Sequence, residues 1–579
     1  MTLGPTRSTV AYFSMEICLE QAIPTYSGGL GVLAGDTLRS AADLGVPLVA
    51  VTLLHRKGYF TQHLDATGHQ SESPVEWKPE EVLEAVDERA TVTIEGRTVH
   101  VRAWRYAVKG VRGHEVPVFL LDTMLDKNSD FDRGLTDYLY GGDEHYRMCQ
   151  EIVLGMGGAS MLQQLGYDAG VIYHLNEGHS ALLTLQLLER QLDGRQHFEL
   201  EDADLEAVRQ RCVFTTHTPV PAGHDKFPLE SVRRVLGDER VALLEGCGGV
   251  YEGMLNMTHL ALHLTRFVNG VAMRHRDVSR TMFPDYPINS ITNGVHATTW
   301  ASPAFAALFD RRIPEWRRDN LYLRYAVGIP LQEIRDAHLE SKTALLDEVL
   351  ARTGVTLDPS LLTIGFARRA TPYKRADLIF TDVERLATIA RKVGKLQIVF
   401  GGKAHPHDGG GKELIRRIFA ADERLKGLVE VVYLENYEMA LAAKMVAGVD
   451  LWLNNPMKPL EASGTSGMKA AINGVPSFSV LDGWWVEGHV EGVTGWSIGG
   501  PDAETDPSAD ALDLYIKLER VILPLFYGLP FAYAEVMRSA IALNGSFFNT
   551  QRMVRQYVHN AYFPDSLPQD VRIEETALW

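Results

Sequence analysis

The segment EASGTSGMKAAING, residues 461–474, places Lys469 close to a predicted helix start. The small residues 463–467 leave several backbone N–H groups without intrahelical partners, and these groups carry the positive end of the helix dipole. A cation is unfavourable there unless an anion joins it. A phosphate group would satisfy both the open amides and the ammonium group. The segment therefore predicts a phosphate site that includes Lys469.

A second cluster of charge lies in ARRATPYKRADL, residues 367–378. Within residues 368–375 it brings together four cations and no acid, namely Arg368, Arg369, Lys374 and Arg375. A solvated basic loop is the alternative interpretation of such a cluster. Its position directly after a predicted strand favours a site for two phosphates, because arginine forks match oxyanions and a lysine acts as a point charge.

A glycine-rich loop, YSGGLGVLAGD at residues 26–36, precedes a predicted helix and contains Gly28, Gly29 and Gly31. Its backbone could approach an oxyanion closely, although such turns often serve chain geometry alone. The full dinucleotide fingerprint G-x-G-x-x-G and the GK[ST] ending of a P-loop are both absent from it. These absences disfavour a nicotinamide enzyme and an NTPase.

Further polar side chains lie at or beyond the ends of predicted strands. They are Glu177, His179, His217, His224, Asn293 and His296, and LDGWWVEG adds Asp482, Trp484, Trp485 and Glu487. Histidines at such ends are commonly packed and hydrogen-bonded, so no metal site is predicted. Amide, imidazole, carboxylate and indole groups together suit a sugar, which needs polar partners and an aromatic face. Core packing is the alternative interpretation of both tryptophans.

Short apolar runs alternate with helical patterns along the chain, which is typical of α/β proteins with parallel sheets. Strands are predicted within residues 46–54, 115–123, 170–178, 212–220, 361–369, 395–403, 429–437 and 450–456. We expect an α/β domain over 1–300, a helical connection over 301–356, a doubly wound domain over 357–510, and helices over 511–579 that pack back on the first domain. Ligands lie beyond the carboxyl ends of such strands, so two facing domains would form a cleft between them.

The composition limits the classes of protein. The chain has 57 Lys and Arg against 74 Asp and Glu, a net charge of −17, which disfavours nucleic-acid and membrane partners. The four cysteines form no C-x-x-C pair, so neither a disulfide framework nor a zinc site is predicted. No apolar run approaches the roughly 20 residues that span a bilayer. We expect a soluble cytoplasmic protein.

Together these motifs resemble the α-glucan (glycogen/maltodextrin) phosphorylases, most strongly the shorter bacterial and archaeal type, over about residues 12–488. EASGTSGMKAAING is similar to the family's EASGTGNMK-x-x-x-NG, RRATPYKR to K-R-I-H-E-Y-K-R, and SGGLG to N-G-G-L-G. LNEGH resembles L-N-D-T-H and TTHT resembles T-N-H-T, while TNG, LENY and GGKA are shared. The resemblance implies two Rossmann-like domains facing across a cleft, the GT-B glycosyltransferase architecture.

The resemblance also implies pyridoxal 5′-phosphate, bound covalently to Lys469. Its contacts would come from Arg368, Lys374, Tyr437, Gly464, Thr465 and Ser466. Substrate phosphate would meet Arg369, Lys374 and the amides of Gly28, Gly29 and Leu30. The glucose would meet Glu177, His179, His217, Asn293, Glu461, Ala462, Ser463 and Gly464. The implied catalytic residues are Lys469, Arg369, Lys374, His217 and Glu461.

The implied reaction is reversible, retaining phosphorolysis of glycogen or maltodextrin by inorganic phosphate, which gives α-D-glucose 1-phosphate. Two alternatives stay open: a nucleotide-sugar-dependent α-glucan synthase of the same architecture, and a glucan-binding protein without turnover. Thr371 and Pro372 replace the family's imidazole and carboxylate, and Ser27 replaces an asparagine. Acceptor preference and allosteric control are therefore open. The formation of a homo-oligomer is open independently of these departures.

Overall fold

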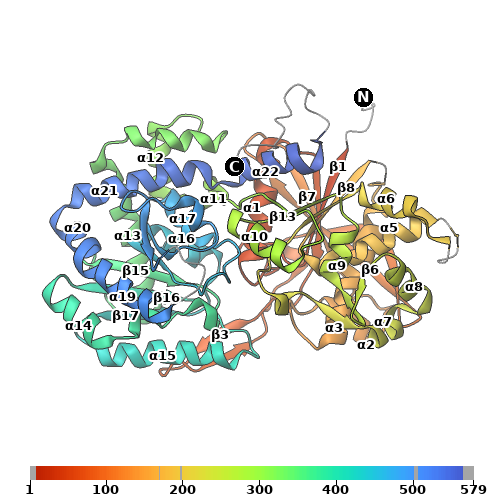
Figure 1. Cartoon of the computed structure of the whole chain (residues 1–579), viewed down its shortest axis with the longest axis horizontal. Helices are drawn as coiled ribbons and strands as arrows, with labels where there is room; N and C mark the ends of the chain where they lie inside the picture. Colours follow the sequence, from red (N-terminus) through yellow and green to blue (C-terminus); the bar gives the residue numbers. More distant parts are fainter. Residues whose placement is uncertain (1–7, 169, 193, 196–198, 501–505, 565–579) are drawn as a thin grey trace.

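The computed structural model describes residues 8–168, 170–192, 194–195, 199–500 and 506–564. These residues form two large β-sheets with flanking helices, one on the right of Figure 1 and one on the left. Both sheets are mainly parallel, as the alternation of apolar runs and helical patterns predicts. The expected α/β fold with parallel sheets is confirmed.

The first sheet has nine strands in the order β14-β13-β9-β8-β1-β2-β7-β6-β5. They are β1 (Thr9–Ser14), β2 (Leu48–Leu53), β5 (Glu84–Ile94), β6 (Arg97–Lys109), β7 (Glu115–Asp122), β8 (Val171–Asn176), β9 (Cys212–Thr215), β13 (Phe267–Gly270) and β14 (Asn289–Ser290). Only β6 pairs in the antiparallel sense, with β5 and β7. The edge strand β5 exposes charged residues and buries apolar ones at its end, as a strand with one solvated face does.

Helices and small strands surround this sheet. The helices are α1 (Gly29–Leu44), α2 (Asp130–Arg133), α3 (Glu144–Ile152), α4 (Gly158–Gln164), α5 (Leu182–Leu192), α6 (Asp202–Arg209), α7 (Leu229–Leu236), α8 (Asp238–Gly246), α9 (Met257–His263) and α10 (Met273–Met282). A small sheet contains β10 (Lys226–Pro228), β12 (Met254–Asn256) and β11 (Val250–Tyr251). Across the described ranges, no helix is long and apolar enough to cross a bilayer.

The second sheet is entirely parallel, in the order β17-β16-β15-β18-β19-β20. Its strands are β15 (Leu362–Ala367), β16 (Leu396–Gly401), β17 (Glu430–Leu434), β18 (Leu451–Asn454), β19 (Ser477–Val480) and β20 (Gly495–Ile498). Its helices are α14 (Val383–Lys392), α15 (Gly409–Leu425), α16 (Met439–Gly448), α17 (Ser466–Ile472) and α18 (Trp485–Gly488). Strands β15 and β16 are buried throughout because helices cover both faces.

Helices connect the two sheets and end the described chain. The connection contains α11 (Ala297–Trp300), α12 (Pro303–Arg312), η7 (Asn320–Gly328) and α13 (Leu331–Thr353). The last elements are α19 (Pro507–Lys517), η10 (Leu518–Ile522), α20 (Leu523–Gly528), α21 (Pro530–Ser539), η11 (Ala540–Gly545), α22 (Thr550–Tyr557) and η12 (Val558–Tyr562). Elements α19–η11 share the apolar core of the second sheet, whereas α22 and η12 pack with β1 and α1 of the first. Residues 565–579 of the expected C-terminal segment lie outside the described residues.

A hairpin of the first half, β3 (Thr61–Leu64) with β4 (Gln70–Ser73), contacts loops of the second half. Gln62 Nε2 donates to the Gly402 carbonyl at 3.0 Å, and Asn436 Nδ2 donates to the Gln62 carbonyl at 2.8 Å. Gln70 Nε2 donates to the Ala404 carbonyl at 2.9 Å. The hairpin therefore joins the two halves beside the loops that follow β16 and β17.

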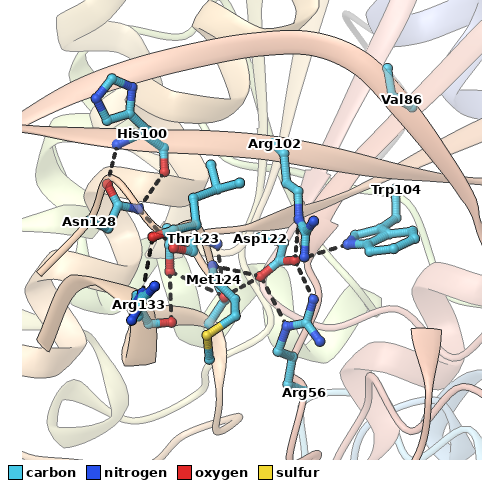
Figure 2. Close-up of polar contacts among 12 residues, drawn as sticks. Arg56, Val86, His100, Arg102, Trp104, Asp122, Thr123, Met124, Asn128 and Arg133 are labelled. Atoms are coloured by element: carbon cyan, nitrogen blue, oxygen red, sulfur yellow. Dashed lines mark hydrogen bonds and ion pairs between the residues drawn. The ribbon is translucent and has the colours of Figure 1, made fainter. Parts of the chain in front are cut away.

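Asp122, at the end of β7, fixes the chain that leads into this hairpin (Figure 2). Its carboxylate accepts hydrogen bonds from Arg56 Nη2 at 2.6 Å, Arg102 Nε at 2.7 Å and Trp104 Nε1 at 3.0 Å. Burial alone would raise the pKa of Asp122, but the hydrogen bonds and charge of Arg56 outweigh it and lower that pKa to about 2. Asp122 is therefore an ionised anchor for Arg56, which precedes the hairpin.

Candidate active site

A cavity of about 600 Å³ lies where the carboxyl ends of strands from both sheets meet. Its walls follow β1, β8 and β9 of the first sheet and β15–β18 of the second. Every residue to which the family resemblance assigns a role lines this cavity: Gly28, Gly29, Leu30, Glu177, His179, His217, Asn293, Arg368, Arg369, Lys374, Tyr437, Glu461, Ala462, Ser463, Gly464, Thr465, Ser466 and Lys469. The fold thus brings the separate motifs together, while their individual roles stay predictions.

Lys469 lies on α17 with its side chain buried in the cavity wall. Its ammonium nitrogen lies 4.0 Å from the centre of the Trp300 ring, so the cation faces an indole. Burial lowers the pKa of Lys469 to about 8, against an opposing effect of Asp36. The lysine therefore loses its proton more readily than a solvated lysine does. Trp300 was not predicted to be a site residue, although it ends the motif ITNGVHATTW at residues 291–300.

Asp36 connects this lysine to the first half of the chain. Its Oδ2 accepts from Trp300 Nε1 at 2.7 Å and from the His296 amide at 3.1 Å. Arg39 forms an ion pair with the other oxygen of Asp36 at 3.2 Å. Helix α1 thus positions the indole that contacts Lys469.

Glu461 is paired with two of the predicted phosphate-binding cations. Its Oε2 lies 2.7 Å from Arg368 Nη2 and 2.6 Å from Lys374 Nζ, and all three side chains are largely buried. Burial alone would raise the pKa of Glu461, but the charges of Arg368 and Lys374 outweigh it and lower that pKa. The family resemblance implies a contact between Glu461 and the glucose, and this pairing with Arg368 and Lys374 was not predicted. Asp482 accepts the Glu461 amide at 2.9 Å and so fixes the backbone there.

Arg375 does not line the cavity, so the prediction that it is a fourth anion-binding cation is wrong. It adopts a left-handed backbone conformation with φ of 49°, and its side chain is buried away from the cavity lining. Its Nε donates to the Asn455 carbonyl at 2.7 Å, and its Nη2 pairs with Asp510 at 2.8 Å. Arg375 therefore stabilises the loop after β18, because the turn at residues 372–374 directs it there.

The glycine-rich loop differs from the prediction of an open amide at Gly28. The Gly28 amide donates to Glu16 Oε2 at 3.2 Å, and the Ser27 amide donates to the same oxygen at 2.6 Å. A Cβ atom on Gly31 would lie 2.7 Å from that oxygen, so glycine is required by the close approach. Arg369 lies beside the loop, as a Cβ atom placed on Gly28 would be 3.5 Å from Arg369 Nη2. Glu16, which the sequence analysis missed, holds the loop.

The opposite wall offers polar groups, of which His217 and Asn293 are neutral. Glu177, with φ of 72°, accepts the His217 amide at 2.7 Å and the Thr218 hydroxyl at 3.0 Å. Burial raises the pKa of Glu177 to about 7 and lowers the pKa of His217 to about 3, so His217 is a neutral imidazole. Within the described residues, Asn293 Oδ1 is buried without a hydrogen-bond partner. His217 and Asn293 can therefore donate and accept hydrogen bonds without adding charge, while Glu177 is partly ionised at neutral pH.

Other predicted residues lie outside the cavity lining. His224 Nδ1 pairs with the Thr258 hydroxyl at 2.8 Å, and His296 Nε2 lies 2.9 Å from Asp43. Trp484 and Trp485 are buried, and the Trp484 ring packs against the chain at Gly467. These positions agree with the packing alternative for each. No group of three or more His, Cys, Asp or Glu suited to a metal is found among the residues that the structure describes.

Cations on one wall and neutral polar groups on the other define a site of the class that joins a phosphate group to a sugar. A family model described as carbohydrate phosphorylase matches residues 239–493. The chain is 41% identical, over 96% of its length, to maltodextrin phosphorylase of Thermococcus litoralis and covers 70% of that protein. It is 37% identical to glycogen phosphorylase of Mycobacterium tuberculosis, over 96% of this chain and 71% of that protein. It is 35% identical to glycogen phosphorylase of Aquifex aeolicus, over 96% of this chain and 86% of that protein. The chain belongs to the carbohydrate phosphorylase family, and the resemblance stated from the sequence is confirmed.

Proposed function

We propose that the chain is an α-1,4-glucan phosphorylase. It transfers the terminal glucose of glycogen or maltodextrin reversibly to inorganic phosphate and forms α-D-glucose 1-phosphate with retention of configuration. The observation that carries the proposal is one cavity that combines Arg369, Lys374 and Lys469 with the neutral polar wall of His217 and Asn293. Family membership and the names of the relatives support the same reaction. The two sheets facing this cavity also support the GT-B architecture, although α19–η11 pack with the second sheet and only α22 and η12 pack back on the first domain.

The residues around Lys469 fit pyridoxal 5′-phosphate. A buried lysine whose pKa is lowered to about 8 is suited to react with an aldehyde, because a free amine is needed. Gly464, Thr465 and Ser466 line the cavity at the start of α17, and Arg368 and Lys374, which pair with Glu461 in the structure, would contact a phosphate group there. Tyr437 lines the same wall. When bound, the cofactor supplies a phosphate group that can exchange a proton with the substrate phosphate.

Arg369 and Lys374 would bind the substrate phosphate, joined by the amides of Gly29 and Leu30. Two phosphate groups close together repel strongly, so concentrated positive charge in a site with little water is needed to hold them. Glu461 offsets part of this charge in the structure, since its carboxylate pairs with Arg368 and Lys374. The chain's contribution to catalysis is therefore preorganised charge around the reacting anion.

Glu461, Ala462, Ser463 and Asn293 would orient the terminal glucose. Ser463 Oγ and Asn293 Oδ1 are both buried and have no partner within the described residues, so each is available to a sugar hydroxyl. Glu177 fixes the backbone at His217 through the His217 amide. That contact would direct the His217 carbonyl to the positive charge that develops at the anomeric carbon.

A comparison of glucosyl donors tests the proposal. The purified protein is given a maltodextrin primer with either α-D-glucose 1-phosphate or a nucleotide-activated glucose, and chain extension is measured. We expect extension from glucose 1-phosphate alone, and loss of extension in Lys469→Ala while maltodextrin binding is retained. Extension only from the nucleotide sugar would support the synthase alternative. Binding of dextrin without extension from either donor would support the binding-protein alternative.

A further inference from the structure

Three distant parts of the chain meet behind Asn293. The turn at residues 292–294 joins β14 to α11, Glu487 belongs to α18 in the second half, and α22 lies near the end of the described chain. The Asn293 amide donates to the Val271 carbonyl at 3.0 Å, while its side-chain Oδ1 is left without a partner in the described part of the chain. The orientation of this carboxamide therefore depends on what holds the backbone of the turn.

Arg552 of α22 binds this backbone directly. Its Nη1 donates to the Thr292 carbonyl at 2.6 Å, and its Nη2 donates to the Asn293 carbonyl at 2.9 Å. Its Nε donates to the Phe547 carbonyl at 3.0 Å, and the guanidinium lies 4.9 Å from the centre of the Phe547 ring. One rigid planar group thus spans two successive carbonyls of the turn.

Neighbouring contacts leave the turn little freedom. A Cβ on Gly294 would lie 2.3 Å from the carbonyl carbon of Asn549, so the two backbones touch. The Val295 amide donates to the Phe548 carbonyl at 3.1 Å, and the Thr550 amide donates to the Val295 carbonyl at 3.0 Å. The start of α22 therefore packs against the turn as a second backbone layer.

Glu487 brings the second half of the chain to the same turn. Its Oε2 accepts the Thr292 hydroxyl at 2.7 Å, and its Oε1 accepts the Met273 amide at 2.8 Å. Burial lowers the pKa of Arg552 to about 10, and the Glu487 carboxylate opposes that effect. Placing a guanidinium in such surroundings has a desolvation cost, which its several carbonyl acceptors offset.

We infer that Arg552 is a positioning residue of the glucose site, which acts through the Thr292 and Asn293 carbonyls to aim the Asn293 carboxamide into the cavity. Helix α22 is then part of the substrate site although it contributes no residue to the cavity lining. A lysine could keep one of the two carbonyl contacts, whereas methionine would keep neither. The inference rests on the proposed function for the identity of the sugar.

A double-mutant cycle between Arg552 and Asn293 tests this. The variants are Arg552→Met, Arg552→Lys, Asn293→Ala and the combination of Arg552→Met with Asn293→Ala. Arg555→Met is the matched control, because Arg555 lies on the same helix with an exposed side chain that pairs only loosely with Asp319, at 3.4 Å. For each variant kcat and KM for glucose 1-phosphate are measured, with the dissociation constant of a maltodextrin as a readout that needs no turnover.

We expect Arg552→Met to lower kcat/KM by about tenfold, the size of effect that loss of one well-placed hydrogen bond to a substrate produces. In the Asn293→Ala background, Arg552→Met should lower kcat/KM by less than about twofold, because the effects of two coupled substitutions do not add. Arg552→Lys should recover part of the loss, and Arg555→Met should resemble wild type.

The inference would be overturned if Arg552→Met lowered kcat/KM equally in the wild-type and the Asn293→Ala backgrounds. Wild-type values of kcat and KM in Arg552→Met would also overturn it. If Arg552→Met does not fold, an unaltered kcat/KM in the folded Arg552→Lys variant would equally overturn it. If wild type does not use glucose 1-phosphate, the proposed function fails. The same double-mutant cycle, measured through the dissociation constant of the maltodextrin, then tests the positioning role of Arg552 separately.

Discussion

Replacing Lys469 by methionine should stabilise the protein at neutral pH once bound cofactor has been removed. Lys469 is a buried lysine whose pKa is lowered to about 8, so its charged form at pH 7 is held in an unfavourable place. In the unfolded chain the same amine regains its ordinary pKa of about 10.5. Methionine has a similar length and needs no solvation, so it removes this cost.

The size of the effect follows from the shift. Two and a half pKa units correspond to about 3 kcal/mol of unfolding free energy. The folded-state pKa already reflects the contact of the ammonium with Trp300, so the gain in Lys469→Met is about 3 kcal/mol at pH 7. Between about pH 8 and 10.5 the unfolded chain holds more protons than the folded one, so wild type gains stability as pH rises through this window. The difference between the two proteins should therefore shrink toward zero near pH 10.5.

Urea unfolding of both cofactor-free proteins, at several pH values from 7 to 10, measures this difference. Lys444→Met is the matched control, because Lys444 is partly exposed and pairs with Glu348 on the surface. It should show no comparable gain at pH 7. A Lys469→Met variant that is no more stable than wild type at pH 7, or a difference that does not change with pH, would refute the reasoning.

Two further predictions concern charge in the site and in the first sheet. Arg369→Met should lower the rate of glucose 1-phosphate release by about a hundredfold or more, because it removes preorganised charge from the site of the reacting anion. Arg417→Met is the control, because the Arg417 side chain is exposed. An unchanged rate for Arg369→Met would mean that Arg369 does not contact phosphate. Asp122→Asn should lower the unfolding free energy by about 2 kcal/mol at pH 7, because the depressed pKa of Asp122 contributes stability above its unfolded value of 3.8. This contribution is lost as pH falls toward 2, so urea midpoints that differ equally at pH 7 and pH 3 would contradict it.

The site was predictable from the sequence to the extent that its residues follow strands. Arg368, Glu177 and His217 each come directly after a parallel strand, and the carboxyl ends of such strands meet at one edge. Glu16 also follows a parallel strand, β1, but this strand was not predicted from the sequence, and Trp300 lies in a helix. A single carboxylate or indole has many structural roles, and only the folded chain shows that Glu16 accepts loop amides and that Trp300 faces Lys469.

Charge pattern alone was a poor guide to pairing. The cluster at 368–375 correctly indicated a site, yet Arg375 turns away because the backbone there is left-handed. Glu461 was assigned by its position in a motif, and its pairing with Arg368 and Lys374 depends on the approach of the loop after β15 to the loop after β18. The antiparallel addition of β5 and β6 to the first sheet was likewise not predicted, because many of the residues along β5 are charged and solvated.

Phosphorus-31 NMR of the protein with maltodextrin and inorganic phosphate tests the central claim most directly. The proposed function predicts that the signal of inorganic phosphate falls while a signal of α-D-glucose 1-phosphate rises in equal amount, and that Lys469→Ala abolishes the conversion. Free glucose released without any new phosphorus signal, a β-configured product, or full conversion by Lys469→Ala would contradict the account.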